Sequence, residues 1–239
     1  MIEDGDKIAI GISGGKDSLT LLYALSELRR FYPQKYELTA VTVDLGFKNL
    51  NTDGILKLCN ELNVPYEVIK TDIAEIVFDE RKESNPCSLC SKMRKGALNY
   101  FMKDKGYNKV AYAHHKDDVV DTMMLSMIYE GRFHTFAPVT YLDKTGMTII
   151  RPLIYMNEAD VVGFVRANNL PVVKSPCPAD HNTKREYVKN LLNGVNSDAP
   201  GVKRRMFTAI LNSNIKGWEN IDSVKKQSGE LHGENEELS

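Results

Sequence analysis

Residues 7–30 read KIAIGISGGKDSLTLLYALSELRR, and this stretch decides the fold. An apolar run over residues 7–12 is typical of a buried strand, and leucines recur at three- and four-residue steps after residue 20, as on one face of a helix. The loop between them, SGGKDS, holds two glycines, which can adopt positive φ and let the backbone approach a ligand closely. A helix start presents unpaired N–H groups and the positive end of the helix dipole. The stretch therefore predicts a strand, a loop and a helix that together bind an anion.

The side chains of this loop suit phosphate. Its terminal serines can donate hydrogen bonds and Lys16 adds a positive charge, whereas Asp17 would repel phosphate unless it works through a metal ion or caps the helix. The alternative to an anion-binding loop is an ordinary strand-to-helix turn with a serine cap. The spacing differs from a Walker A loop, which has four residues between its first glycine and its Gly-Lys pair. The six residues expected to form the nucleotide site, with Asp17 acting through a metal ion, are Ser13, Gly14, Gly15, Lys16, Asp17 and Ser18.

Further along the chain, strand-like runs alternate with helical patterns. This order predicts an α/β fold with a mostly parallel, twisted, five-stranded sheet and helices on both faces. The expected strands cover residues 7–12, 37–44, 66–70 and 109–114, with a fifth near Ile149. In such sheets ligands bind beyond the carboxyl ends of the strands, where SGGKDS, Asp44 and HHKDD all fall.

Length and composition limit the classes of protein to which this chain can belong. A chain of 239 residues with 42% hydrophobic residues can bury a substantial core, and we expect one domain over 1–217 followed by a disordered polar tail over 218–239. No apolar run approaches the roughly 20 residues that span a bilayer, and the first residues lack a secretion signal, so we expect a cytoplasmic protein without membrane contact. The net charge of −1 gives no overall basic field for nucleic acid.

Contact with RNA would therefore depend on local basic patches, each of which is more often a solvated helix face. The candidate patches are Lys92, Arg94 and Lys95, then Lys184 and Arg185, then Lys203, Arg204 and Arg205.

The stretch AHHKDDVVDT contains two histidines and two adjacent aspartates at a predicted helix start. One aspartate there could simply cap the helix. Two exceed that need, and Mg²⁺ is commonly held by one or two carboxylates together with substrate phosphates. A zinc site from His114, His115 and Asp117 is less favoured, since adjacent side chains diverge.

Four cysteines occur, and Cys59 lies on an apolar helix face as a core residue would. Cys87 and Cys90 form a CxxC pair, and Cys177 follows in SPCPAD. A CxxC pair can be a redox couple, half of a zinc site or half of an iron–sulfur site. A zinc site on these three cysteines would need a fourth ligand, such as Asp180 or His181. Three thiolates can instead hold a [4Fe-4S] cluster with one open iron. The third possibility is that the thiols bind no metal.

Six stretches make a resemblance specific: SGGKDS, VDLGF, PCSLCSKMRKG, AHHKDDVVDT, IRPL and SPCPAD. Their order and spacing over roughly residues 1–212 resemble the tRNA 2-thiocytidine synthetase family of PP-loop ATP pyrophosphatases, which have an adenine nucleotide alpha hydrolase-like fold. The resemblance implies that ATP is cleaved to AMP and pyrophosphate, and that sulfur is inserted at C2 of a cytidine in the tRNA anticodon loop. It also implies a [4Fe-4S] cluster on Cys87, Cys90 and Cys177, and a sulfur donor, either a cysteine desulfurase or sulfide.

Carried over to this chain, the resemblance gives expected roles. Asp17 and Asp118 would hold Mg²⁺, and Arg94, one helical turn after Cys90, could face an adenylate. The residues expected to bind the nucleotide are the six of the loop with Asp44, Ala113, His114 and Asp118. The residues expected to act in catalysis are Lys16, Asp17, Asp118, Arg94 and Cys177.

Two positions depart from the family pattern: Asp121 replaces the usual Glu, and Ala179 stands where another cysteine is frequent. The alternatives are a PP-loop ligase of the lysidine synthetase kind, thiolation of another base or of a small molecule, and a nucleotide sensor or zinc-stabilised adaptor without turnover. Pairing of two chains into a homodimer stays open.

Overall fold

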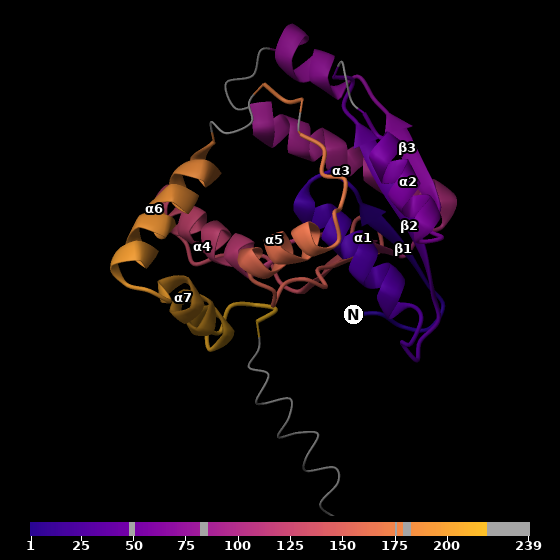
Figure 1. The fold of residues 1–239 in the computed structure, drawn as a ribbon. Helices are drawn as coiled ribbons and strands as arrows, with labels where there is room; N and C mark the ends of the chain where they lie inside the picture. Colours follow the sequence, from indigo (N-terminus) through magenta and orange to yellow (C-terminus); the bar gives the residue numbers. More distant parts are fainter. Residues whose placement is uncertain (48–50, 82–85, 175, 179–182, 219–239) are drawn as a thin grey trace, which may run out of the picture. The chain divides into compact units, whose positions relative to one another are not determined.

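The computed structural model describes residues 1–47, 51–81, 86–174, 176–178 and 183–218 (Figure 1). The chain forms two compact units, and each is considered by itself. The first comprises Met1–Lys116 and Val139–Thr183, and the second Asp117–Pro138 and Lys184–Ser239. The expected extent of one domain over 1–217 stays a prediction.

The first unit is built on a six-stranded sheet with the order β3-β2-β1-β4-β6-β5. All neighbours pair in parallel except β5 and β6. The strands are β1 (Asp6–Gly11), β2 (Tyr36–Asp44), β3 (Tyr66–Lys70), β4 (Lys109–Ala111), β5 (Val139–Leu142) and β6 (Met147–Ile150). The α/β fold with a mostly parallel sheet is confirmed.

The expected number of five strands was wrong, because β5 was missed. It is four residues long, lies at the sheet edge and joins β6 through a tight antiparallel hairpin. The prediction relied on strands separated by helices, and a hairpin has no helix between its strands. β4 also ends at Ala111, three residues before the expected end at His114.

Alternation along the strands divides the core into two layers. Ile8 and Ile10 of β1 point to one face, while Ala9 points to the other, as the two-residue period of a strand requires. The first face is covered by α1 (Lys16–Leu28), α2 (Asp53–Glu61) and α5 (Glu158–Ala167). The opposite face is covered by α3 (Pro86–Lys105), through Leu98 and Met102. A short π-helix, η1 (Glu75–Glu80), follows β3. The first unit therefore has three layers, with helices on both faces of the sheet (Figure 1).

Because β1, β2, β4 and β6 run in the same direction, their carboxyl ends share one edge of the sheet. SGGKDS follows β1, Asp44 ends β2, residues 112–115 follow β4 and Arg151 follows β6. In parallel sheets this edge is where ligands bind. The fold therefore places four separate segments of the first unit at one binding edge.

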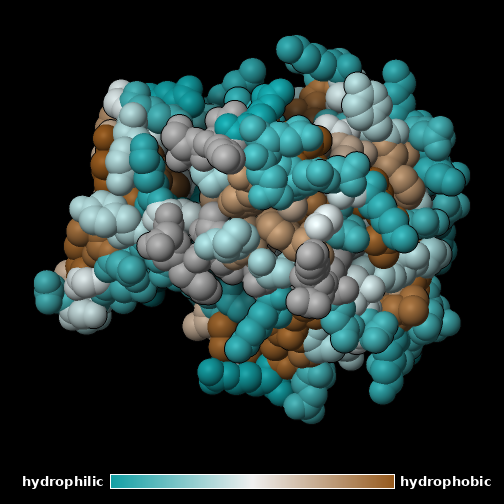
Figure 2. Space-filling view, turned by 90° about the horizontal axis from the view of Figure 1, so that it is seen from above, coloured by the Kyte–Doolittle hydropathy of each residue, from teal (hydrophilic) through white to brown (hydrophobic). Residues whose placement is uncertain are grey.

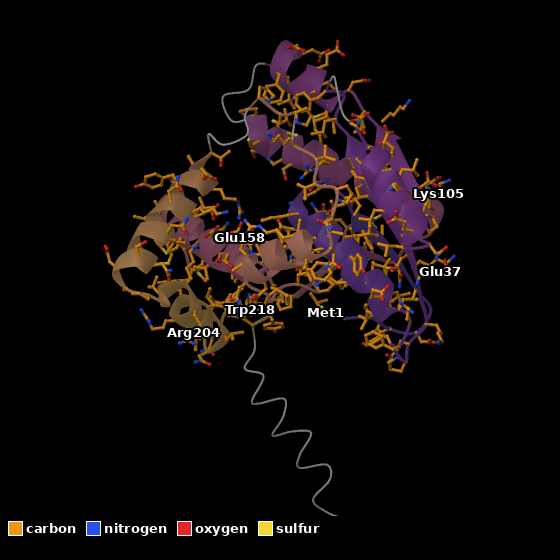
Figure 3. The ribbon with its side chains drawn as sticks, in the orientation of Figure 1. Met1, Glu37, Lys105, Glu158, Arg204 and Trp218 are labelled. Atoms are coloured by element: carbon orange, nitrogen blue, oxygen red, sulfur yellow. The ribbon has the colours of Figure 1, made fainter. Side chains whose placement is uncertain are left out.

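The second unit is helical. It contains most of α4 (Lys116–Glu130), together with α6 (Lys184–Asp198) and α7 (Val202–Leu211). Trp218, labelled in Figure 3, is 2% exposed, packs edge-on against Phe207 and donates a hydrogen bond from Nε1 to the carbonyl of Phe136 (3.1 Å). Trp218 is the first residue of the expected tail over 218–239, whose other residues, 219–239, lie outside the described residues.

Hydrophilic residues cover much of the face in Figure 2, with hydrophobic residues gathered in smaller areas. Large hydrophobic side chains that remain exposed in the second unit are Met127, Ile128, Tyr129, Phe133, Tyr187, Leu191 and Val195. Among the described residues, no helix has the length and apolar character that crossing a membrane requires.

Candidate active site

The SGGKDS loop has one position that demands glycine. Gly14 has φ +82°, and a Cβ there would lie 3.1 Å from Cβ of Val173. Its carbonyl accepts a hydrogen bond from the backbone N–H of Val173 (2.9 Å). Gly15 is extended, with φ −76° and ψ 163°, and stands at the N-cap of α1. Gly14 alone of the pair uses positive φ, and the segment at Val173 is packed directly on the loop.

The loop serines hold the turn together. Ser18 Oγ donates to the carbonyl of Gly15 (2.9 Å), and Ser13 Oγ accepts from the N–H of Gly15 (3.3 Å). The N–H of Ser13 donates to Ser18 Oγ (3.3 Å). Among the described residues no side chain caps the start of α1. The first N–H groups of α1 are therefore available to an anion, and the phosphate site stays a prediction.

Lys16 lies between two carboxylates. Its Nζ is 2.9 Å from Oδ1 of Asp17 and 3.1 Å from Oε1 of Glu158. Glu158, labelled in Figure 3, is the first residue of α5. Burial alone would lower the pKa of Lys16, but the hydrogen bonds and charges of Asp17 and Glu158 outweigh it and raise this pKa. His115 Nε2 is 3.6 Å from Oδ1 of the same aspartate. Lys16 is therefore charged, and a phosphate would bind it by displacing a carboxylate.

Sequence reasoning missed Glu158. It lies in the first turn of α5, where Asn157 and Asp160 form a capping box. The pattern NEAD marks a helix start, but nothing in it indicates the distant Lys16 as a partner. A sequence reading could have found the helix start and not the ion pair.

Three further predicted nucleotide-binding residues lie at the same edge of the first unit. Asp44 Oδ1 accepts from the N–H of Gly46 (2.9 Å), so its carboxylate shapes the turn after β2. Ala113 is half-buried against the core. His114 is also half-buried, and its Nδ1 accepts from Nε of Arg151 (3.3 Å). Arg151 belongs to the IRPL stretch, to which sequence reasoning gave no role.

In the second unit, basic residues face the aspartates at the start of α4. Lys203 Nζ is 3.6 Å from Oδ1 of Asp117, and Arg185 Nη1 is 3.6 Å from Oδ1 of Asp118. Asp121 is 4% exposed, and within the described residues its Oδ1 has no hydrogen-bond partner. Burial raises the pKa of Asp121 to about 6, with Lys203 and Arg185 opposing the shift and the other two aspartates adding to it.

These observations leave the metal assignments as follows. Asp17 belongs to the first unit and Asp118 to the second, so their joint role in holding Mg²⁺ stays a prediction. No three His, Cys, Asp or Glu side chains in the described ranges are grouped closely enough to hold a metal ion. The zinc alternative on His114, His115 and Asp117 gains no support from the geometry.

Cys59 is a core residue, as the sequence predicted: it is fully buried, and burial raises the pKa of its thiol to about 11. Cys87 is exposed, whereas Cys90 and Cys177 are half-buried. Burial raises the pKa of Cys90; Cys177 and Cys87 add to this shift and Arg94 opposes it.

Cys87, Cys177 and Arg94 therefore lie within electrostatic range of Cys90. Among the described residues, however, the three thiols are not close enough together to ligate one metal ion. Arg94 itself is exposed on α3. Ala179, Asp180 and His181, which bear on the fourth-ligand alternatives, lie outside the described residues.

Comparison with known proteins gives consistent results. The model of the PP-loop domain family matches residues 3–195. The tRNA-cytidine(32) 2-sulfurtransferase of Geobacter sulfurreducens is 38% identical over 215 residues, which cover 89% of this chain and 84% of that protein. The protein of the same name from Syntrophotalea carbinolica is 36% identical over 232 residues, 96% of this chain and 89% of the relative.

A solved structure with a similar fold is the U34-tRNA thiolase NcsA from Methanococcus maripaludis with its [4Fe-4S] cluster. It has a TM-score of 0.71 and 29% identity, and the match covers 87% of this chain and 71% of that one. The family model spans most of the chain, and the relatives match over most of their own length. The chain therefore belongs to the PP-loop ATP pyrophosphatases and, within them, to the tRNA 2-thiocytidine synthetase family.

Proposed function

We propose that this protein is an ATP-dependent tRNA sulfurtransferase that replaces the C2 oxygen of an anticodon-loop cytidine with sulfur. One observation carries the proposal. The PP-loop and Cys87, Cys90 and Cys177 belong to one compact unit, in a chain whose relatives are named tRNA-cytidine(32) 2-sulfurtransferases. The names of those relatives favour position 32 as the target. The cytoplasm, where ATP and tRNA are available, is the expected compartment.

The first role of the site is to bind ATP. Its phosphates would take the N–H groups at the start of α1 and the ammonium of Lys16. Because Lys16 now contacts Asp17 and Glu158, phosphate would displace a carboxylate from it. Asp17, once released, would be available with Asp118 to hold Mg²⁺, which would offset phosphate charge.

The first chemical step would be adenylation. The C2 oxygen of the cytosine attacks the α-phosphorus, the bond to the β-phosphate oxygen breaks and pyrophosphate leaves. Lys16 would stabilise the negative charge that develops on the phosphates. A sulfur nucleophile then attacks C2, and the former C2 oxygen leaves as part of AMP. Unpaired loop bases can be splayed out for such a reaction.

The second role is to hold the sulfur chemistry. When bound on Cys87, Cys90 and Cys177, a [4Fe-4S] cluster would supply an iron with an open position for a sulfur atom. The donor set suits this group in its chemistry, since the thiols of Cys87 and Cys177 both lie within electrostatic range of Cys90 and Arg94 opposes the rise in the pKa of the Cys90 thiol. Thiolate is the form that binds metal. The named thiolase NcsA, whose structure contains such a cluster, supports the assignment.

The test is a thiolation assay on anaerobically purified protein with an unmodified tRNA transcript, ATP and sulfide. We expect nucleoside mass spectrometry to detect 2-thiocytidine together with AMP, and neither when ATP is omitted. A transcript with uridine in place of the cytidine at position 32 is the control for position. Formation of AMP without any thiolated nucleoside would contradict the proposal and favour a ligase.

A matched pair of cysteine variants sharpens this test. Cys177→Ser should abolish thiolation while ATP binding persists, because the PP-loop is unchanged. Cys59→Ala should retain thiolation, since Cys59 is buried in the core. Full thiolation by Cys177→Ser would exclude the cluster.

A further inference from the structure

Arg151 is a buried cation for which the mechanism above has no use. It directly follows β6, in the IRPL stretch, and is 6% exposed. Its Nε donates to Nδ1 of His114 (3.3 Å), and its Nη1 donates to Oγ1 of Thr140 (3.0 Å). The guanidinium thus joins a strand of the edge hairpin to a histidine at the binding edge.

The chemistry of guanidinium restricts that histidine. Arginine has hydrogen-bond donors and no acceptor. Burial lowers the pKa of Arg151 to about 10, and nearby Tyr112 opposes this shift, so Arg151 keeps its charge at neutral pH. Nδ1 of His114 must therefore accept. A neutral imidazole that accepts at one ring nitrogen carries its proton on the other, here Nε2.

The hydrogen bond from Arg151 leaves no room for a proton on Nδ1 of His114. A proton on Nδ1 would point at the N–H of Arg151 and set two cations side by side. The Tyr112 ring lies against His114, with centroids 5.9 Å apart, and Tyr112 is within electrostatic range of both Arg151 and Arg94.

Thr140 gives the edge hairpin a part in this arrangement. Thr140 pairs with Ile149 across β5 and β6, two residues before Arg151. The hairpin therefore carries both the arginine and the hydroxyl that fixes one arm of its guanidinium.

We propose that Arg151 is a positioning residue that fixes His114 as the Nε2–H tautomer, so that the imidazole donates a hydrogen bond to an acceptor atom of the bound nucleotide. This assignment rests on the proposed ATP site at the same edge. It excludes His114 as a general base, since the lone pair at Nδ1 is already engaged.

Nitrogen-15 NMR of protein with labelled histidine rings tests the tautomer in the absence of ATP. The chain has 5 histidines, and His114→Gln identifies the signal of interest. We expect Nδ1 of His114 to show the shift of an unprotonated ring nitrogen and Nε2 that of a protonated one. A protonated Nδ1 in the free protein would overturn the proposal, whatever the activity.

Variants test whether Arg151 is what fixes the tautomer of His114. Arg151→Met should give a mixture of both tautomers at His114 and a roughly tenfold weaker affinity for ATP, the usual cost of one such hydrogen bond. Thr140→Val, which keeps both residues and removes the acceptor of Nη1, should shift the same signal less and covers the case in which Arg151→Met does not fold. Arg166→Met, at an exposed arginine of the same unit, is the matched control and should change neither readout.

The positioning role of Arg151 and the proposed function can be disproved independently of each other. An unchanged tautomer in Arg151→Met would overturn the positioning role even if thiolation proceeds normally. If wild-type protein did not bind ATP, the proposed function would fail, while the NMR spectrum of the free protein would still decide the tautomer.

Discussion

At the scale of single residues, backbone conformation shows where the PP-loop depends on glycine. Gly14→Ala would place a methyl group at φ +82° and 3.1 Å from Cβ of Val173. A left-handed conformation costs an L-residue about 1–2 kcal/mol. We expect a loss of stability of that order in chemical denaturation, and weaker ATP binding in calorimetry because the loop must shift.

Gly163→Ala is the control for this prediction. Gly163 lies inside α5, and a Cβ there meets nothing within 4 Å. Alanine is favoured over glycine in a helix by about 1 kcal/mol, so this variant should be slightly more stable. Equal effects of the two substitutions would show that Gly14 has no special backbone role.

The buried carboxyl of Asp121 should make stability depend on pH. Its pKa is raised from 3.8 in an unfolded chain to about 6, so between these values the folded state binds more protons than the unfolded state. Stability therefore falls as pH rises through this window, and the full penalty, about 3 kcal/mol, is present above pH 6. Asp121→Asn should remove this dependence and be more stable at pH 7.5.

Urea denaturation of the wild type and of Asp121→Asn from pH 4 to pH 8 would measure this pH dependence of stability. Asp198→Asn, on an exposed aspartate of the same unit, should leave the pH profile unchanged. Parallel profiles for wild type and Asp121→Asn would show that the carboxyl is ionised without cost.

At the scale of elements, the sequence predicted what depends on local pattern. The apolar run in KIAIGI and the leucine spacing after SGGKDS were enough for β1, the loop and α1, because each signal lies within one segment. The short hairpin strand β5 and the Lys16–Glu158 pair were missed, since both depend on which segments the fold brings together. For the same reason, the role of Arg151 could not be read from IRPL.

A buried ion pair fastens the amino ends of β1 and β4. Lys109 Nζ is 2.8 Å from both Asp6 Oδ2 and Glu3 Oε2, and Asp6 is 2% exposed. Burial would raise the pKa of Asp6, but hydrogen bonds from the backbone N–H of Glu3 and from the side chains of Lys109 and Asn108 outweigh it and lower this pKa. Lys109→Met would leave a buried charge without its cation, which typically costs 3–5 kcal/mol.

Denaturation should therefore show a large loss for Lys109→Met and a change within about 0.5 kcal/mol for Lys7→Met, whose exposed side chain lies 3.8 Å from Glu37. These residues lie at the amino ends of the strands, opposite the binding edge. Folded Lys109→Met protein should thus bind ATP normally, and a selective loss of ATP binding would contradict a purely structural role.

At the scale of the whole molecule, the proposed sulfur chemistry would depend on thiols from two distant segments of the first unit. Cys87 and Cys90 begin α3, and Cys177 follows α5, yet both of the other thiols influence the pKa of Cys90. The described thiols are not yet grouped as metal ligands, so a cluster would draw them closer. All three should then be needed, because loss of one ligand leaves two iron sites without a protein thiolate.

The measurement is an absorption spectrum with iron and sulfide analysis, on protein purified without oxygen. We expect a broad brown absorbance and about four irons per chain, as a [4Fe-4S] cluster requires. Cys87→Ser, Cys90→Ser and Cys177→Ser should each lose it, and Cys59→Ala should keep it. Zinc in a colourless protein after anaerobic reconstitution would instead assign these thiols to a structural site, and the sulfur would then have to reach the adenylated cytidine directly from a donor.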